Sequence, residues 1–338
     1  MSKFYIKNRK ILIIGGAGFI GHNLALKLKS LGAKVSILDG LTINNWYSVK
    51  KNNNNLPFPK LSLKILEERF LLLKKNKIPL KIIDARDYHK LSNYINIFKP
   101  QVIIHLAAVS HSNRSNKDPH TTFDHSLRTL ENALDNAKNN IEHFIFLSSS
   151  MVYGNFTKKK VKENDVCEPI GIYGALKFSA EKIIKSYGQV FNLPYTIIRP
   201  SALYGERCIS RRVGQIFIEN VLTKSDIILN GDGTEKLDFT YINDLINGII
   251  CVIKSKNSLQ ETFNITYGNA RTINSLVEII KKNFSKVKIV YKPRDKLMPI
   301  RGTLDVSKAK KLLNFESKWS LDRGYPAYIR WYKDLFKK

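Results

Sequence analysis

The chain contains few cysteines, and those it has form no recognisable pattern. Cys167, Cys208 and Cys251 are scattered through the 338 residues, are odd in number and lack the spacing of metal ligands. We therefore expect no metal site, and a reducing cytoplasm is the simplest compartment for the protein.

Long apolar runs are also missing. None reaches the roughly 18 residues that a membrane span needs, so we expect no membrane partner. The first ten residues lead directly into a predicted strand, which leaves no room for a signal peptide. Hydrophobic residues make up 43% of the chain, and its length suffices for one large or two modest domains with a sizeable core.

Acidic residues are scarce relative to basic ones. The chain has 28 Asp and Glu against 56 Lys and Arg, a formal net charge of +28 at pH 7. Such an excess is found in nucleic-acid-binding proteins. However, the lysines are spread along the chain in short runs such as Lys158–Lys160, and no aromatic residues interleave with them in an RNA-binding motif. We interpret them as solvated surface lysines and expect no nucleic-acid partner, although a basic surface attracts an anionic nucleotide.

The most informative stretch is rich in glycine. Residues 11–14 are aliphatic and predict a buried strand, and three glycines at G-x-x-G-x-x-G spacing precede a helical pattern. In such a unit the first glycine allows a sharp turn, the second lets a pyrophosphate approach the backbone, and the third lets the helix lie close to the strand. The helix N-terminus then offers free N–H groups to the phosphates. The predicted cofactor contacts are Gly15, Gly18, Phe19, Ile20 and Gly21.

Two carboxylates follow the next predicted strands. Asp39 ends the strand over 34–39, where it can bind both ribose hydroxyls of an adenosine. It would repel a 2′-phosphate and no arginine follows it, so NAD is favoured over NADP. Asp84 closes the strand over 80–83 and is placed to accept the adenine amino group. The alternative for Asp84 is a helix N-cap, and the two roles are compatible.

Strand and helix patterns alternate from the start of the chain, which favours an α/β fold with a doubly wound parallel sheet of the Rossmann type. We expect an NAD-binding domain over 1–200 and a smaller C-terminal α/β substrate-binding lobe over 201–338. The strand and helix over 237–253 are expected to return to the first domain. Residues 41–80 form an insertion beside the adenosine end of the cofactor or over the substrate cleft, with no role that the pattern assigns. Ala107, at the end of the fourth strand, is expected to lie against the cofactor.

Tyr173 and Lys177 lie one helical turn apart, so their side chains share a face. A free phenol has a pKa near 10, too high for a base at neutral pH. A nearby ammonium and a positive nicotinamide ring both favour phenolate and would lower that pKa. The pair is therefore predicted to remove a hydroxyl proton while hydride leaves the same carbon.

Taken in order, these motifs identify a resemblance. The chain resembles the extended short-chain dehydrogenases/reductases of the nucleotide-sugar epimerase/dehydratase family, of the UDP-glucose 4-epimerase type, over essentially its whole length. The resemblance implies a tightly held NAD and a nucleoside diphosphate sugar in the cleft between the lobes. It also implies a homodimer with a four-helix interface built from helices near 121–138 and 174–190. The matching elements are Gly15–Gly21, Asp39, Asp84, His105–Ala108, Ser149–Gly154, Tyr173 with Lys177, Arg199-Pro200 and Gly231–Gly233.

The resemblance also bears on the reaction. Ser149 takes the position of the family's catalytic Ser/Thr, which hydrogen-bonds the reacting sugar hydroxyl. The next two positions are Asp and Glu in sugar 4,6-dehydratases, and decarboxylases share that Glu, but here they are Ser150 and Met151. A methionine cannot transfer a proton, so 4-epimerisation is favoured. The alternatives are an NAD(P)-dependent nucleotide-sugar reductase, dehydrogenase or dehydratase, and a catalytically silent nucleotide- or RNA-binding protein.

The sequence departs from the family pattern where the substrate is held. Leu237 stands where an arginine usually grips the diphosphate, and Ala202 replaces a frequent asparagine. Other arginines are suited to supply the charge, because a planar guanidinium matches a diphosphate. The polar segment 110–114 is a further candidate contact for the sugar. The predicted substrate contacts are Ser150, Arg212, Lys236 and Arg301, with Arg211 and Arg294 as further sources of charge.

Overall fold

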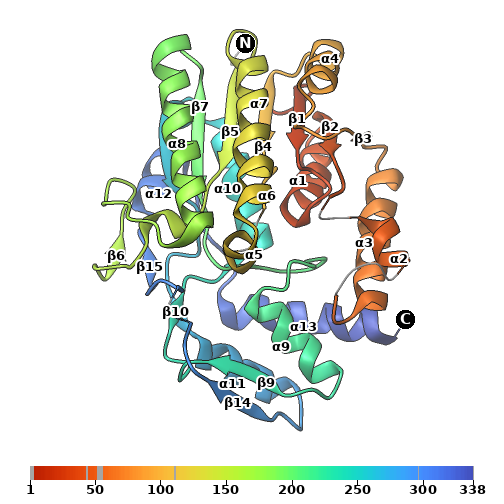
Figure 1. Cartoon of the computed structure of the whole chain (residues 1–338), viewed down its shortest axis with the longest axis vertical. Coiled ribbons are helices and arrows are strands. Elements are labelled where there is room, and N and C mark those ends of the chain that lie inside the picture. Colours follow the sequence, from red (N-terminus) through yellow and green to blue (C-terminus); the bar gives the residue numbers. More distant parts are fainter. Residues whose placement is uncertain (1–3, 43–44, 52–55, 110–111, 296, 338) are drawn as a thin grey trace.

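The computed structural model describes residues 4–42, 45–51, 56–109, 112–295 and 297–337. At its centre lies a seven-stranded sheet in the order β12-β7-β5-β4-β1-β2-β3, with every neighbouring pair parallel (Figure 1). The predicted Rossmann-type sheet is thereby confirmed. Its strands are β1 (Lys10–Ile14), β2 (Lys34–Asp39), β3 (Leu80–Ile82), β4 (Val102–His105), β5 (His143–Leu147), β7 (Tyr195–Arg199) and β12 (Glu261–Asn264).

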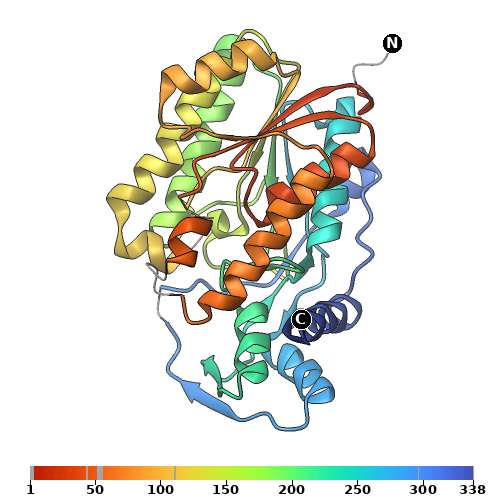
Figure 2. The same ribbon diagram turned by 90° about the vertical axis from the view of Figure 1, so that its right-hand side faces the viewer.

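Both faces of the sheet are covered by helices, which is why the central strands β1, β4 and β5 are buried along nearly their whole length rather than at alternate residues. Ile11 and Ile13 of β1 pack into the core under α1 (Phe19–Ser30) and α10 (Ile242–Lys254). Leu12 and Ile14 pack on the other face, in the core that the second group of helices covers. That second group is α4 (Tyr88–Phe98), α7 (Thr129–Ala137) and α8 (Gly171–Phe191) (Figures 1 and 2).

The insertion over 41–80 adds two helices to the α1 side. These are α2 (Trp46–Lys50) and α3 (Pro59–Lys75), and α3 packs against α1. Pro59 stands at the first helical position, where its fixed φ suits the helix and its missing N–H costs no hydrogen bond. Two short helices, α5 (Ser112–Lys117) and α6 (Pro119–Phe123), and a π-helical turn over 124–128 lead into α7.

The C-terminal part lies beyond the carboxyl ends of the sheet strands (Figure 1). Its helices are α9 (Val213–Leu222), α11 (Ile273–Asn283) and α13 (Leu321–Lys337), whereas α12 (Ser307–Leu313) packs beside the sheet against β12. Its short strands form pairs rather than a second large sheet. The pairs are β9 (Ile227–Asn230) with β14 (Ile289–Lys292), β10 (Lys236–Leu237) with β13 (Arg271–Thr272), β11 (Thr240–Tyr241) with β8 (Leu203–Tyr204), and β15 (Thr303–Leu304) with β6 (Lys160–Val161).

The return of the chain to the central sheet differs in detail from the prediction. The expected strand over 237–241 is split between β10 and β11, which pair with different partners. The elements that reach the central layers are α10, which packs on α1, and β12, which pairs with β7 at the edge of the sheet. Residues 237–241 do not form one continuous strand, because the backbone turns between β10 and β11, where the N–H of Phe239 donates to the carbonyl oxygen of Leu237 at 3.0 Å.

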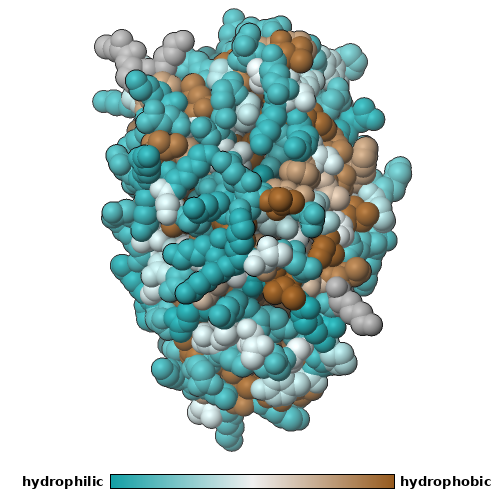
Figure 3. Space-filling view, turned by 90° about the vertical axis from the view of Figure 1, so that its left-hand side faces the viewer, coloured by the Kyte–Doolittle hydropathy of each residue, from teal (hydrophilic) through white to brown (hydrophobic). Residues whose placement is uncertain are grey.

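The surface on the side of α8, β6 and α12 is mostly hydrophilic, with apolar residues in small groups (Figure 3). No helix in the described part of the chain has both the length and the apolar character needed to cross a bilayer. Within the same residues, no three side chains of the His, Cys, Asp and Glu types gather as metal ligands would.

Candidate active site

The glycine turn connects β1 to α1 in the predicted way. Gly15 has a φ of +79°, and a Cβ on it would lie 2.6 Å from the backbone nitrogen of Ala107. A Cβ on Gly21 would lie 2.6 Å from the carbonyl oxygen of Gly16, so only glycine lets α1 approach the turn so closely. Gly18 is the N-cap of α1, and no side chain caps that end. The first N–H groups of the helix are thus available to an anion.

Asp39 ties the end of β2 to this turn. Its carboxylate is buried and accepts hydrogen bonds from the backbone N–H groups of Ala17 at 2.9 Å and Leu41 at 2.8 Å. Burial raises the pKa of Asp39, and these two bonds act in the opposite direction. Each carboxylate oxygen retains acceptor capacity for a ribose hydroxyl.

Asp84 has a partner that the sequence pattern did not reveal. Its carboxylate accepts hydrogen bonds from the guanidinium of Arg86, with Nε–Oδ2 at 3.0 Å, and Arg86 also pairs with Asp124 at 2.7 Å. The hydrogen bond from Arg86 lowers the pKa of Asp84. The helix-cap alternative for Asp84 is wrong, because Asp87 caps α4 by accepting from the Lys90 N–H.

The three predicted catalytic residues meet at one pocket. Ser149 follows β5, whereas Tyr173 and Lys177 occupy the first turns of α8, and all three line the pocket. The Ser149 side chain lies near enough to Tyr173 to lower the pKa of that phenol. Lys177 donates to the carbonyl oxygen of Leu147 at 2.6 Å and lies 4.6 Å above the centroid of the Phe146 ring.

The electrostatics of this trio differ from the expectation in one respect. Burial raises the pKa of Tyr173, and the opposing effects come from the charge of Arg212 and the nearby Ser149 side chain, not from Lys177. Burial also lowers the pKa of Lys177 itself to about 8, against the attraction of Glu181. The sequence placed Tyr173 and Lys177 correctly on one helical face, but it could not reveal that the Lys177 ammonium turns toward a backbone carbonyl.

Behind Lys177 lies a buried ion pair that sequence reasoning missed. Glu181, one turn further along α8, accepts from Arg199 Nε at 2.9 Å and from Arg199 Nη2 at 2.6 Å. It also accepts from the hydroxyl of Ser148, the residue before Ser149. Although burial opposes it, the hydrogen bond and charge of Glu181 raise the pKa of Arg199. The signal available in the sequence was the Lys177–Glu181 spacing together with an arginine ending β7.

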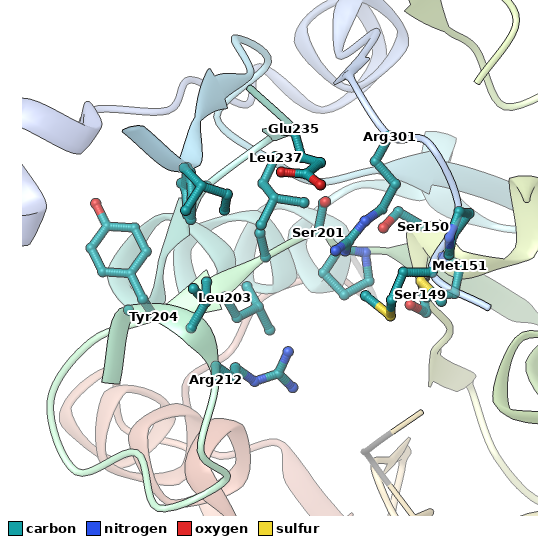
Figure 4. A pocket seen from close by; sticks show the side chains of 18 of the residues that line it. Ser149, Ser150, Met151, Ser201, Leu203, Tyr204, Arg212, Glu235, Leu237 and Arg301 are labelled. Atoms are coloured by element: carbon teal, nitrogen blue, oxygen red, sulfur yellow. Dashed lines mark hydrogen bonds between the residues drawn. The ribbon is translucent and has the colours of Figure 1, made fainter. Parts of the chain in front are cut away.

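The pocket extends from this trio into the C-terminal part, where arginines enter it (Figure 4). Arg212 and Arg301 point into the pocket, and the buried Nε atom of each has no hydrogen-bond partner among the described residues. Burial, together with the charges of Arg212 and Arg294, lowers the pKa of Arg301 to about 10. Two guanidinium groups that repel each other in this way form a site for an anion.

The other arginines predicted as sources of charge are neutralised by carboxylates. Arg294 Nε lies 3.3 Å from Glu235, and Arg211 lies 2.9 Å from Glu219. The two remaining predicted substrate contacts differ in exposure. Ser150 is buried in the pocket wall, whereas Lys236 is an exposed residue that lines the pocket. Leu237 is buried in the wall. Of the segment 110–114, residues 110–111 and the side chains of 112–114 lie outside the part of the chain that the structure describes.

Comparison with known proteins identifies the family. The sequence model of the NAD dependent epimerase/dehydratase family matches residues 11–266, from the glycine turn to the last strand of the sheet. The chain belongs to this family. A putative UDP-glucose 4-epimerase of Methanocaldococcus jannaschii is 32% identical over 331 residues, which cover 96% of this chain and 98% of the relative. An uncharacterized UDP-glucose epimerase of Bacillus subtilis is 30% identical, over 97% of this chain and 99% of the relative.

Solved structures agree with this assignment. The UDP-glucuronic acid 4-epimerase of Bacillus cereus, in complex with UDP-glucuronic acid and NAD, has a TM-score of 0.86 at 26% identity and covers 96% of this chain and 99% of its own. The UDP-glucose 4-epimerase of Thermotoga maritima, with UDP-glucose, has a TM-score of 0.81 at 27% identity and covers 97% and 99%. The family's members are enzymes that act on nucleotide sugars, and NAD is the cofactor of this one. The glycine turn, the uncapped start of α1 and the Asp39 carboxylate fit that cofactor.

Proposed function

We propose that the protein is an NAD-dependent epimerase that inverts C4 of a nucleoside diphosphate sugar through a transient 4-keto sugar. The observation that carries this proposal is the set of groups around Tyr173. Ser149, Tyr173 and Lys177 line one pocket, and the neighbours of Ser149 in the pocket wall are Ser150 and Met151. The carboxylates among the described lining residues are Glu235 and Asp295, both in the C-terminal part. Expulsion of water needs an acid beside the sugar, whereas epimerisation does not.

The residues have distinct roles in this proposal. Bound NAD would accept hydride from C4 and return it to the other face of the sugar. Tyr173 removes the proton of the C4 hydroxyl and gives it back, and Ser149 hydrogen-bonds the same oxygen. Because burial alone raises the pKa of Tyr173, the phenolate depends on positive charge from Arg212, and a cationic cofactor ring adds to it. Lys177, anchored on Leu147, adds a cation to the same end of the pocket.

The diphosphate is proposed to lie between Arg212 and Arg301, two half-buried arginines whose buried Nε atoms have no hydrogen-bond partner among the described residues. Arg212 and Arg301 would supply the positive charge that the family's usual arginine provides at the position of Leu237. The relatives named above, which include UDP-glucose and UDP-glucuronic acid epimerases, support a UDP-sugar as substrate. Residues 201–338, which supply both arginines, are proposed to form chiefly the substrate-binding lobe.

The test is incubation of the purified protein with a panel of nucleotide sugars, followed by proton NMR. Appearance of the C4 epimer without added cofactor, by protein that carries NAD through gel filtration, supports the proposal. The alternative is a net reductase or dehydrogenase on the same residues. A requirement for added NAD(P)H, with loss of the absorbance of the reduced nicotinamide and no epimer, would replace the epimerase with that alternative.

We also propose a homodimer in which α7 and α8 form a four-helix interface. Phe123, at the end of α6, and Ile172, Val190 and Phe191 of α8 are large apolar side chains exposed to solvent. Light scattering after gel filtration tests this, and a monomeric mass at micromolar concentration would contradict it. The cysteines are free thiols, which fits the reducing cytoplasm that we propose as the compartment.

A further inference from the structure

Three segments that are distant in the sequence meet beside the glycine turn. They are the start of α1, the helix α3 of the insertion, and the loop over 205–211 that ends at Arg212, the N-cap of α9. Figure 2 shows α3, in orange, running alongside α1 toward the C-terminal part. Neither the cofactor nor the proposed diphosphate site explains why charged side chains fill this junction.

Arg69 on α3 joins the loop to the glycine turn. Its side chain is buried, with 1% of its surface exposed. Nε and Nη2 both donate to the carbonyl oxygen of Arg207, with Nε at 2.9 Å, and Nη1 donates to the carbonyl oxygen of Ala17 at 3.2 Å. The N–H of Ala17 is the one that Asp39 binds. One guanidinium therefore bridges the loop and the cofactor-binding turn.

The side chain of Arg207 extends from the loop to the start of α1 and to α3. Its Nε donates to Nε2 of His22 at 3.0 Å, its Nη2 donates to Asn23 Oδ1 at 2.8 Å, and its Nη1 pairs with Glu68 at 3.2 Å. Because Nε2 of His22 accepts, Nδ1 carries the proton and donates to the carbonyl oxygen of Gly18 at 2.8 Å. Burial lowers the pKa of His22 well below its usual value, and the charges of Arg69 and Arg207 lower it further, so the ring stays neutral.

The loop needs this support because its backbone is strained. Arg207 and Arg211 have φ values of +63° and +48°, in the left-handed region that β-carbons disfavour. Such strained residues persist only where their surroundings hold them. At Arg207 the surroundings are the bonds from Arg69 to its carbonyl and the bonds from its own side chain. Without them the loop would relax, and Arg212 would move with it.

We propose that Arg69 and Arg207 are positioning residues that hold the 205–211 loop against the glycine turn, so that Arg212 faces the diphosphate and NAD binding favours nucleotide-sugar binding. The inference rests on the proposed role of Arg212 toward the substrate. It assigns a role to the insertion, which supplies Arg69 and Glu68. By reciprocity, a nucleoside diphosphate should favour NAD binding by the same factor.

The experiment measures UDP binding, with dTDP as a second probe, by calorimetry on NAD-loaded and NAD-stripped full-length protein. The wild type is expected to bind the probe at least about fivefold more tightly when loaded, the lower end of typical coupling. Arg207→Gln is expected to bring this ratio close to one. The matched control is Arg330→Gln, an exposed arginine of α13, which should keep the wild-type ratio.

The ratio of the UDP affinities with and without NAD decides whether Arg207 has the proposed positioning role. A wild-type ratio of one, or an unchanged ratio in Arg207→Gln, would overturn the proposal even if the variant melts at a lower temperature. Should Arg207→Gln fail to fold, Glu68→Gln removes the charge that pairs with Arg207 without changing the shape of the side chain, and it must lower the ratio partway. If loaded wild-type protein binds neither UDP nor dTDP, the proposed function fails as well. Binding without coupling overturns only the positioning role.

Discussion

The Glu181–Arg199 pair allows a quantitative test of how the catalytic end of the pocket is held. Glu181→Gln keeps the shape of the side chain and a hydrogen-bonding oxygen, but it removes the charge. The side chains of Arg199 and Glu181 are 2% and 1% exposed, so the guanidinium would remain buried without its counterion. Removing one partner of a buried ion pair costs roughly 3–5 kcal/mol.

An exposed pair with the same shortest distance supplies the control. Arg271 and Asp322 are 2.6 Å apart, the same distance as the buried pair, but their side chains are 37% and 60% exposed. Exposed pairs contribute about 0–1 kcal/mol, so Asp322→Asn should change stability little. The double variant Glu181→Leu with Arg199→Met should lose less than Glu181→Gln, because it buries no unpaired charge.

Urea denaturation followed by circular dichroism measures the change in the free energy of unfolding for all four proteins, the wild type included. The reasoning is refuted if Glu181→Gln costs no more than Asp322→Asn. It is also refuted if the apolar double variant is less stable than Glu181→Gln, since packing rather than charge would then dominate.

Three further outcomes are expected. Tyr173→Phe should abolish epimerisation while NAD still co-elutes with the protein, and near wild-type turnover by NMR would exclude Tyr173 as the base. Arg212→Met and Arg301→Met should each weaken UDP binding by calorimetry about 10- to 100-fold, corresponding to about 1.5–3 kcal/mol for a charged hydrogen bond, whereas Arg330→Met should have no effect. Because burial raises the pKa of Tyr173, the phenolate fraction and with it kcat/KM should rise with pH, and the rise should weaken above about pH 8, where Lys177 loses its proton; a rise that continues unchanged from pH 7 to 9 would contradict a role for the Lys177 charge.

The sequence predicts best where function depends on neighbouring residues. The glycine turn, Asp39 and the Tyr173–Lys177 pair each follow from a strand end or a helical spacing, and the structure brings them to one edge of the sheet. The Arg86–Asp84 pair and the Arg69–Arg207 contacts were not predicted. Each depends on a side-chain rotamer or on segments more than a hundred residues apart, and periodicity carries no information about either.

The same reasoning explains why the reaction is easier to infer than the substrate. The catalytic end of the pocket is built from β5 and α8, regular elements whose residues keep fixed relations to one another. The anion-binding end is built from a strained loop and a connecting segment, which bring Arg212 and Arg301 together from positions that no local pattern relates. In the proposed function, in which Leu237 stands in place of the family's usual arginine, the position of the diphosphate depends on that loop. Substrate selection then depends on how the insertion and the glycine turn hold the loop, so changes at Glu68 or His22 should alter substrate affinity without touching the substrate.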